Sequence, residues 1–86
     1  MNTLTANPTD NLTLYFREGN SDKIYQCAIE PGGDGLFAVT FAYGRRGSTL
    51  ATGTKTSEPV GYDDAKRIFD ELVREKVAKG YTPGAD

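Results

Sequence analysis

Residues 36–47, LFAVTFAYGRRG, decide the fold of this chain, because they join a strand pattern directly to a tight turn. The larger side chains recur at every second position, at Phe37, Val39, Phe41 and Tyr43. A period of two is typical of a β-strand. Two glycines, Gly44 and Gly47, then permit backbone angles that other residues avoid. We therefore expect a strand that ends in a sharp reversal of the chain.

The turn after this strand carries an aromatic ring and two adjacent arginines, Tyr43, Arg45 and Arg46. Guanidinium groups match the geometry of phosphate and carboxylate, and an aromatic face can stack on a base or a sugar. A solvated hairpin with two surface arginines is the simpler alternative, because arginine is usually exposed. The turn is therefore a candidate binding tip.

Bulk composition indicates one small globular domain. The chain has 86 residues, of which 37% are hydrophobic and 26% charged. No apolar run approaches the roughly 18–20 residues that cross a membrane, and the N-terminus lacks the features of a signal peptide. We predict a cytoplasmic protein. The single cysteine, Cys27, lies in an apolar strand pattern, which favours a packed thiol over a reactive one.

Catalytic and metal-binding chemistry has little support in the sequence. The chain has no histidine, which is the commonest general base and a frequent metal ligand. The neighbouring carboxylates Asp63 and Asp64 point in different directions on a helix and suit its N-terminus instead. We therefore predict no enzyme activity, no catalytic residues, no cofactor and no metal site.

Charge is distributed unevenly along the chain, whose net charge is −2. Residues 1–35 hold two bases and five acids, and residues 58–86 hold five bases and seven acids. Residues 36–57 hold Arg45, Arg46 and Lys55 without any acid. The candidate tip is therefore part of a basic island on an acidic body, which suits a polyanionic partner.

Alternation and turn residues predict an α+β fold in which one helix covers a four-stranded antiparallel sheet. The expected strands are residues 12–17, 23–30, 36–43 and 48–57, and the expected helix is residues 62–79. Residues 31–35 should form a loop that cannot continue a strand, and Gly53 is a candidate bulge. We expect a flexible lead-in at 1–10, one domain at 11–82 and a tail at 83–86.

One basic residue falls on the apolar stripe of the expected helix. Lys76 lies near the centre of the stripe formed by Ala65, Ile68, Phe69, Leu72 and Val73. Its stem can extend over the sheet edge. Alternatively, its ammonium points to a binding surface or to a buried carboxylate.

Four segments can be compared together: residues 20–25 at a strand start, residues 43–47, residues 62–65 at a helix start and residues 75–81 at its end. In this order and spacing they resemble the WGR domain family, named for a Trp-Gly-Arg motif. The resemblance covers about residues 12–82. Tyr43 replaces the tryptophan of the family, and tyrosine keeps an aromatic face of smaller area. The family occurs in poly(ADP-ribose) polymerases and in bacterial proteins, some of them short.

The resemblance implies a non-catalytic module that binds DNA ends or nicks weakly and without sequence preference. By position, Tyr43 would pack on a terminal nucleotide, and Gly44 and Arg45 match the motif, with Arg45 holding phosphate. Lys23 occupies a position that is often basic in the family. Arg46 and Lys55 join the candidate DNA-binding residues only because they belong to the same acid-free segment.

An interaction module that docks on an acidic protein surface remains the alternative hypothesis. Contacts between domains are also a property of the family, and the acidic body of the chain fits this function. DNA-end binding predicts that affinity depends on Arg45, on a 5′ phosphate and on low salt. Protein docking predicts no DNA binding even at low salt.

Overall fold

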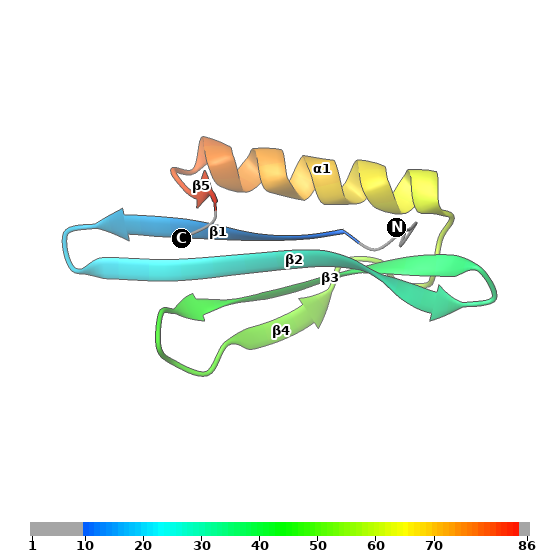
Figure 1. Cartoon of the computed structure of the whole chain (residues 1–86), viewed down its shortest axis with the longest axis horizontal. Coiled ribbons are helices and arrows are strands. Elements are labelled where there is room, and N and C mark those ends of the chain that lie inside the picture. Colours follow the sequence, from blue (N-terminus) through cyan, green and yellow to red (C-terminus); the bar gives the residue numbers. More distant parts are fainter. Residues whose placement is uncertain (1–9, 85–86) are drawn as a thin grey trace, which may run out of the picture.

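A computed structural model describes residues 10–84 as one antiparallel sheet with a single helix on one face (Figure 1). The strand order is β4-β3-β2-β1-β5. The elements are β1 (Asn11–Glu18), β2 (Ser21–Gly33), β3 (Leu36–Arg45), β4 (Ala51–Thr54), α1 (Tyr62–Ala78) and β5 (Thr82–Pro83). The antiparallel α+β architecture and the C-terminal helix are confirmed, but the sheet has five strands and not four.

The core lies between α1 and the three central strands. Alternate side chains of the strands are buried against the apolar stripe of the helix. The buried residues are Leu14, Tyr25, Cys27, Ile29, Val39, Ala65, Phe69 and Leu72. The expected packed thiol is confirmed, because Cys27 is only 2% exposed. Burial raises the pKa of this thiol to about 11.

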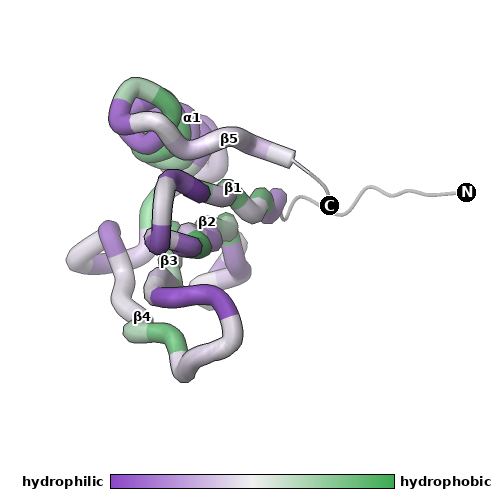
Figure 2. Tube along the Cα trace, turned by 90° about the vertical axis from the view of Figure 1, so that its left-hand side faces the viewer, coloured by the Kyte–Doolittle hydropathy of each residue, from purple (hydrophilic) through white to green (hydrophobic). Residues whose placement is uncertain are grey.

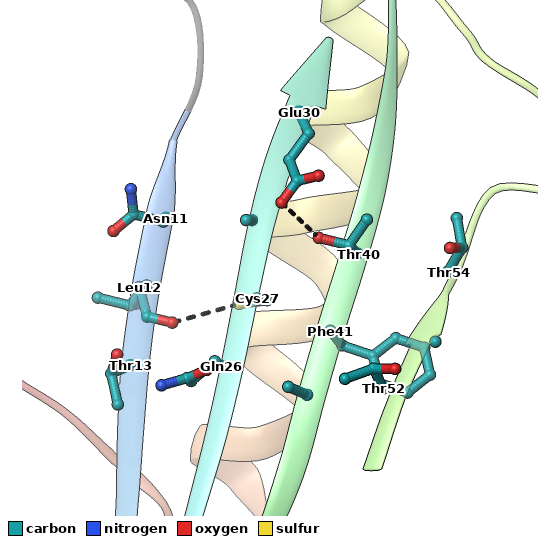
Figure 3. A pocket seen from close by; sticks show the side chains of 13 residues that line it. Asn11, Leu12, Thr13, Gln26, Cys27, Glu30, Thr40, Phe41, Thr52 and Thr54 are labelled. Carbon is teal, nitrogen blue, oxygen red and sulfur yellow. Dashed lines mark hydrogen bonds between the residues drawn. The ribbon is translucent and has the colours of Figure 1, made fainter. Parts of the chain in front are cut away.

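The other face of the sheet is uncovered within residues 10–84 and holds a shallow groove (Figure 3). The groove lies over Ala28 and Ala42, whose side chains are small. Polar side chains surround them, including Thr13, Gln26, Thr40, Thr52 and Thr54. The strand β4 lies farthest from the helix in both orientations (Figures 1 and 2). The helix therefore covers β1 to β3 and leaves β4 at an open edge.

The second strand is longer than the sequence predicts. The expectation that residues 31–35 cannot continue a strand is wrong for residues 31–33, whereas residues 34–35 form the expected turn. β2 runs to Gly33, and Pro31 pairs with Phe37. The pairing register shifts between Pro31 and Gly33. Such an irregularity accommodates proline in a sheet, because it lacks the N–H of a regular ladder.

The fourth strand is shorter than expected, at Ala51–Thr54 instead of residues 48–57. The residues before it form the turn from β3. The expected bulge at Gly53 is wrong, because Gly53 pairs with Phe41 in a regular register. A Cβ at this position would lie 2.5 Å from Cζ of Phe41. Gly53 is therefore required because the Phe41 ring occupies the place of its side chain.

The fifth strand follows the helix and was not predicted. Thr82 and Pro83 pair with Tyr15 and Leu14 of β1. Two residues are too few to show an alternation, and proline argues against a strand unless it lies at an edge. The pairing arises because the helix ends beside β1 and the chain turns back at Gly80.

The helix begins and ends close to its expected bounds of 62–79. At its first turn, the hydroxyl of Tyr62 donates a hydrogen bond of 2.7 Å to Oδ2 of Asp10. This bond joins the helix to the start of β1. The rest of the expected lead-in, residues 1–9, lies outside the described residues. Among residues 10–84, no helix has the length and apolarity needed to span a membrane.

Candidate nucleic-acid interface

The candidate tip forms where two turns and the end of the helix meet. The β1–β2 turn and the β3–β4 turn lie at the same end of the sheet, below the C-terminal end of α1 (Figure 1, left). Two hydrogen bonds join these turns. Nη2 of Arg45 donates to the Asn20 carbonyl at 3.1 Å, and the Arg46 amide donates to the Asp22 carbonyl at 2.8 Å. The β1–β2 turn therefore holds the arginine turn in place.

Tyr43 stands at the end of a row of aromatic rings. The ring of Tyr25 stacks on Tyr43 with a centroid distance of 6.1 Å and on Phe41 with 6.0 Å. Tyr25 itself is buried, whereas Tyr43 is 47% exposed. Burial also raises the pKa of the Tyr25 hydroxyl to about 12, so this ring stays neutral at physiological pH. Tyr43 therefore offers a partly free aromatic surface that is supported from the core.

Gly44 permits the close approach of the turn behind Tyr43. Its φ is +157°, and a Cβ there would lie 3.1 Å from Cδ2 of Leu50. A larger residue would therefore push Leu50 and shift the backbone that carries Tyr43 and Arg45. The role of Gly44 in the tip is to shape the backbone.

The two adjacent arginines separate onto different sides of the sheet. Arg45 pairs with Lys23 in the β2–β3 register, two residues after Tyr43, so it shares the helix-side face with that ring. Arg46 turns to the open face. Its Nε lies 3.2 Å from Oδ1 of Asp22, and its guanidinium carbon lies 5.0 Å from the centroid of the Tyr15 ring. The structure thus brings Arg45 to Tyr43 and engages Arg46 elsewhere.

Lys76 of the last turn of α1 and Lys79, the C-cap residue of α1, join the helix-side face of the tip. Lys23, Lys76 and Lys79 line a shallow hollow with Phe16 and Tyr81. Nζ of Lys76 lies 4.5 Å from the centroid of the Tyr25 ring. Among residues 10–84 no carboxylate is buried, so the hypothesis that Lys76 points to a buried carboxylate in the described chain is wrong. Its ammonium instead lies beside the ring that supports Tyr43.

These helix lysines were absent from the residues that sequence analysis proposed for the site. Lys76 gave a signal, because it falls on the apolar stripe of its helix. Lys79 gave none beyond its place in the last turn, and its Nζ lies 3.7 Å from Oε2 of Glu75. The pattern of one helix does not reveal which end of the sheet its last turn covers.

Lys55 does not belong to the tip. Its amide donates to the carbonyl of Val39 at 2.8 Å. Val39 lies four residues before Tyr43 on β3, which corresponds to about 13 Å along the strand. The structure therefore brings together Tyr43, Gly44, Arg45 and Lys23 and leaves Lys55 apart.

The helix-side face of the tip carries a local excess of positive charge. Its four cationic side chains are Lys23, Arg45, Lys76 and Lys79, and the nearby carboxylates are Glu18 and Glu75. This balance is positive on a chain whose net charge is −2. Within residues 10–84, no group of three or more acidic or cysteine side chains is placed to hold a metal ion. The face can hold an anion and stack on a planar group.

Comparison with known proteins identifies one family. A family model described as WGR domain matches residues 10–86. No curated protein and no solved structure matches the chain. The matched region includes every element of the sheet and the helix.

Proposed function

The chain belongs to the WGR domain family, which in general comprises non-catalytic nucleic-acid-binding modules, and we propose that this protein binds DNA ends or nicks. The observation that carries the proposal is the half-exposed ring of Tyr43 on a sheet face whose same end carries four cationic side chains, Lys23, Arg45, Lys76 and Lys79. An aromatic face stacks on any base, and cations hold phosphates of any sequence. Recognition is therefore independent of sequence.

Each side chain has a distinct task in this proposal. Tyr43 packs on the exposed face of a terminal nucleotide, which exists only where the base stack is interrupted. Arg45 holds a phosphate through its guanidinium group. Lys23, Lys76 and Lys79 attract the neighbouring phosphates as point charges. Arg46, which is paired with Asp22, supports the turn and does not hold phosphate.

The small number of cations sets the expected strength of binding. Four phosphate contacts predict that the logarithm of affinity falls with the logarithm of salt with a slope of about −3 to −4. Such a module alone should bind with a dissociation constant of roughly micromolar or weaker. Affinity should be measurable at low salt and largely lost at physiological salt.

Fluorescence anisotropy with labelled duplexes tests the proposal. The duplexes are a covalently closed dumbbell without a free end, a nicked dumbbell and the same nicked dumbbell with a 5′ phosphate at the nick. We expect binding to rise in that order and to fall at least about tenfold in Arg45→Ala, because a charge-assisted contact is lost. Lys55→Ala is the matched control, since it removes a cation of the same segment that lies away from the tip.

Two results would contradict DNA-end binding. One is equal affinity for the closed and nicked dumbbells, which would indicate a general polyanion surface. The other is no binding at low salt, which would favour the alternative function, docking on an acidic protein surface through the same cations.

A further inference from the structure

The free edge of the sheet at β4 has an unusual set of properties. β4 ends the strand order, and nothing within residues 10–84 pairs with its outer side. It is only four residues long, but it contains no charged residue, no proline and no bulge, which are other common protections of an edge strand. The opposite edge is different, because β5 covers part of β1 and the exposed end of β1 carries Arg17 and Glu18.

The hydrogen-bonding groups of this edge can be assigned from the register. The amide of Lys55 donates to the carbonyl of Val39, so the main chain of Lys55 faces β3. In an antiparallel ladder, the N–H and C=O groups of every second residue face the same neighbouring strand. The N–H and C=O groups of Ala51 and Gly53 therefore face β3, as those of Lys55 do. Thr52 and Thr54 direct their N–H and C=O groups outward.

We propose that β4 pairs with β4 of a second copy of this chain, antiparallel and centred on Gly53. In this register, Thr52 lies opposite Thr54 of the second copy, and Thr54 lies opposite its Thr52. All four outward-facing residues of the two strands then exchange main-chain hydrogen bonds, four in total. The two sheets become one continuous sheet of ten strands with both helices on the same side.

Side chains on the open face suit this register. Thr52 and Thr54 both point to that face and are exposed. The pairing places threonine beside threonine across the junction, a combination that stabilises neighbouring strands. The groove of the open face then continues from one copy into the next.

The side chains on the sheet face that α1 covers also suit the proposed β4–β4 register. The two glycines meet as the non-hydrogen-bonded pair, in which Cβ positions lie about 4.5–5.5 Å apart. Cζ of each Phe41 lies 2.5 Å from the position that a Cβ of Gly53 would take. The two Phe41 rings therefore lie on either side of the two-fold axis, where they add apolar surface to the junction.

Charge does not oppose the pairing. Lys55 of one copy lies opposite Ala51 of the other. The two lysines are four residues apart along the strands, or about 14 Å, which exceeds the ~8 Å screening length at physiological salt. The helices also do not interfere, because β4 lies farthest from α1 (Figures 1 and 2).

Sedimentation of the whole chain between about 10 μM and about 1 mM tests the proposal, since small transient interfaces associate in this range. We expect the mass to rise from 9.3 kDa towards twice that value. Thr52→Lys/Thr54→Lys should abolish the rise, because four ammonium groups would meet across the junction. The control Asn11→Lys/Thr13→Lys adds the same charge at the same spacing on β1 and should dimerise normally. Circular dichroism verifies that both variants are folded.

Disulfide trapping tests the register. Ala51 of one copy is opposite Lys55 of the other, so mixing Ala51→Cys protein with Lys55→Cys protein should give a mixed disulfide much faster than either variant with itself. The native Cys27 is buried and does not compete. A monomer at every concentration, or a dimer that persists in Thr52→Lys/Thr54→Lys, would overturn the proposal. Equal trapping in all three mixtures would overturn the register.

Discussion

Nζ of Lys76 lies 4.5 Å from the centroid of the Tyr25 ring, on which Tyr43 stacks at 6.1 Å. The buried Tyr25 ring thus connects the end of the helix to the exposed aromatic residue of the tip. A cation and an aromatic surface that come from distant parts of the chain are held side by side. This arrangement makes the helix part of the proposed DNA interface.

Lys76→Met should weaken DNA binding while leaving the fold intact, because methionine keeps most of the apolar stem and removes the charge. We expect the salt slope to become less steep by about 1 and affinity to fall several-fold at low salt. Anisotropy titrations at several salt concentrations measure both. Lys66→Met is the control, since Lys66 also lies near an aromatic ring, Phe69 at 5.3 Å, but near the other end of α1. An equal loss in both variants would show that only net charge matters.

Arg45→Ala and Arg46→Ala should have different effects although the residues are adjacent. Arg45 faces the interface and makes one exposed hydrogen bond, to the Asn20 carbonyl, so its loss should reduce DNA affinity and lower stability only slightly. Arg46 contacts Asp22 and the Tyr15 ring, so its loss should lower the free energy of unfolding by about 1 kcal/mol. Urea denaturation and anisotropy on both variants separate these effects. Loss of DNA affinity in a fully folded Arg46→Ala protein would contradict the assignment.

Much of the fold could be predicted from local pattern. Alternation gave three strands, and the apolar stripe gave the helix to within one residue of its end. Two features were not predictable this way. β5 is two residues long and depends on where the helix ends, and β2 passes through Pro31 because the register shifts there. Both are consequences of tertiary pairing, which local pattern does not contain.

The candidate site was predictable only in part. The order of Tyr43, Gly44 and Arg45 in the sequence fixed their common location. The separation of Arg46 from Arg45 depends on Asp22 and Tyr15, which belong to other strands. The position of Lys76 and Lys79 near the tip depends on the direction in which α1 crosses the sheet. Residues far apart in the sequence therefore decide which cations act together.

Gly53→Ala should destabilise the fold, because the added Cβ would lie 2.5 Å from Cζ of Phe41. The ring must move from its place beside Tyr25, and overpacking of this kind costs about 1–3 kcal/mol. Urea denaturation should show a lower midpoint. Gly84→Ala is the control, since nothing lies within 4 Å of the Cβ that it would add. Equal stability of the two variants would mean that the Phe41 ring is not fixed over Gly53.

Stability should fall at alkaline pH because of the buried thiol of Cys27. Burial raises its pKa to about 11, above its value in the unfolded chain. The folded state therefore keeps a proton that the unfolded state has lost, and stability decreases as the pH rises from about 9 to about 11. The slope from this group is about 1.4 kcal/mol per pH unit. Below about pH 9, the contribution of the Cys27 thiol to the free energy of unfolding is constant.

Cys27→Ala isolates this effect. The substitution lowers stability by a constant amount at pH 7 and 8, because it leaves a small cavity. Between pH 9 and 11, urea denaturation should show that the variant loses less stability than the wild type, so that the difference between the two proteins narrows. A difference that stays constant over the whole range would mean that the thiol ionises as easily in the folded chain as in the unfolded one. The core around Cys27 would then be accessible to water.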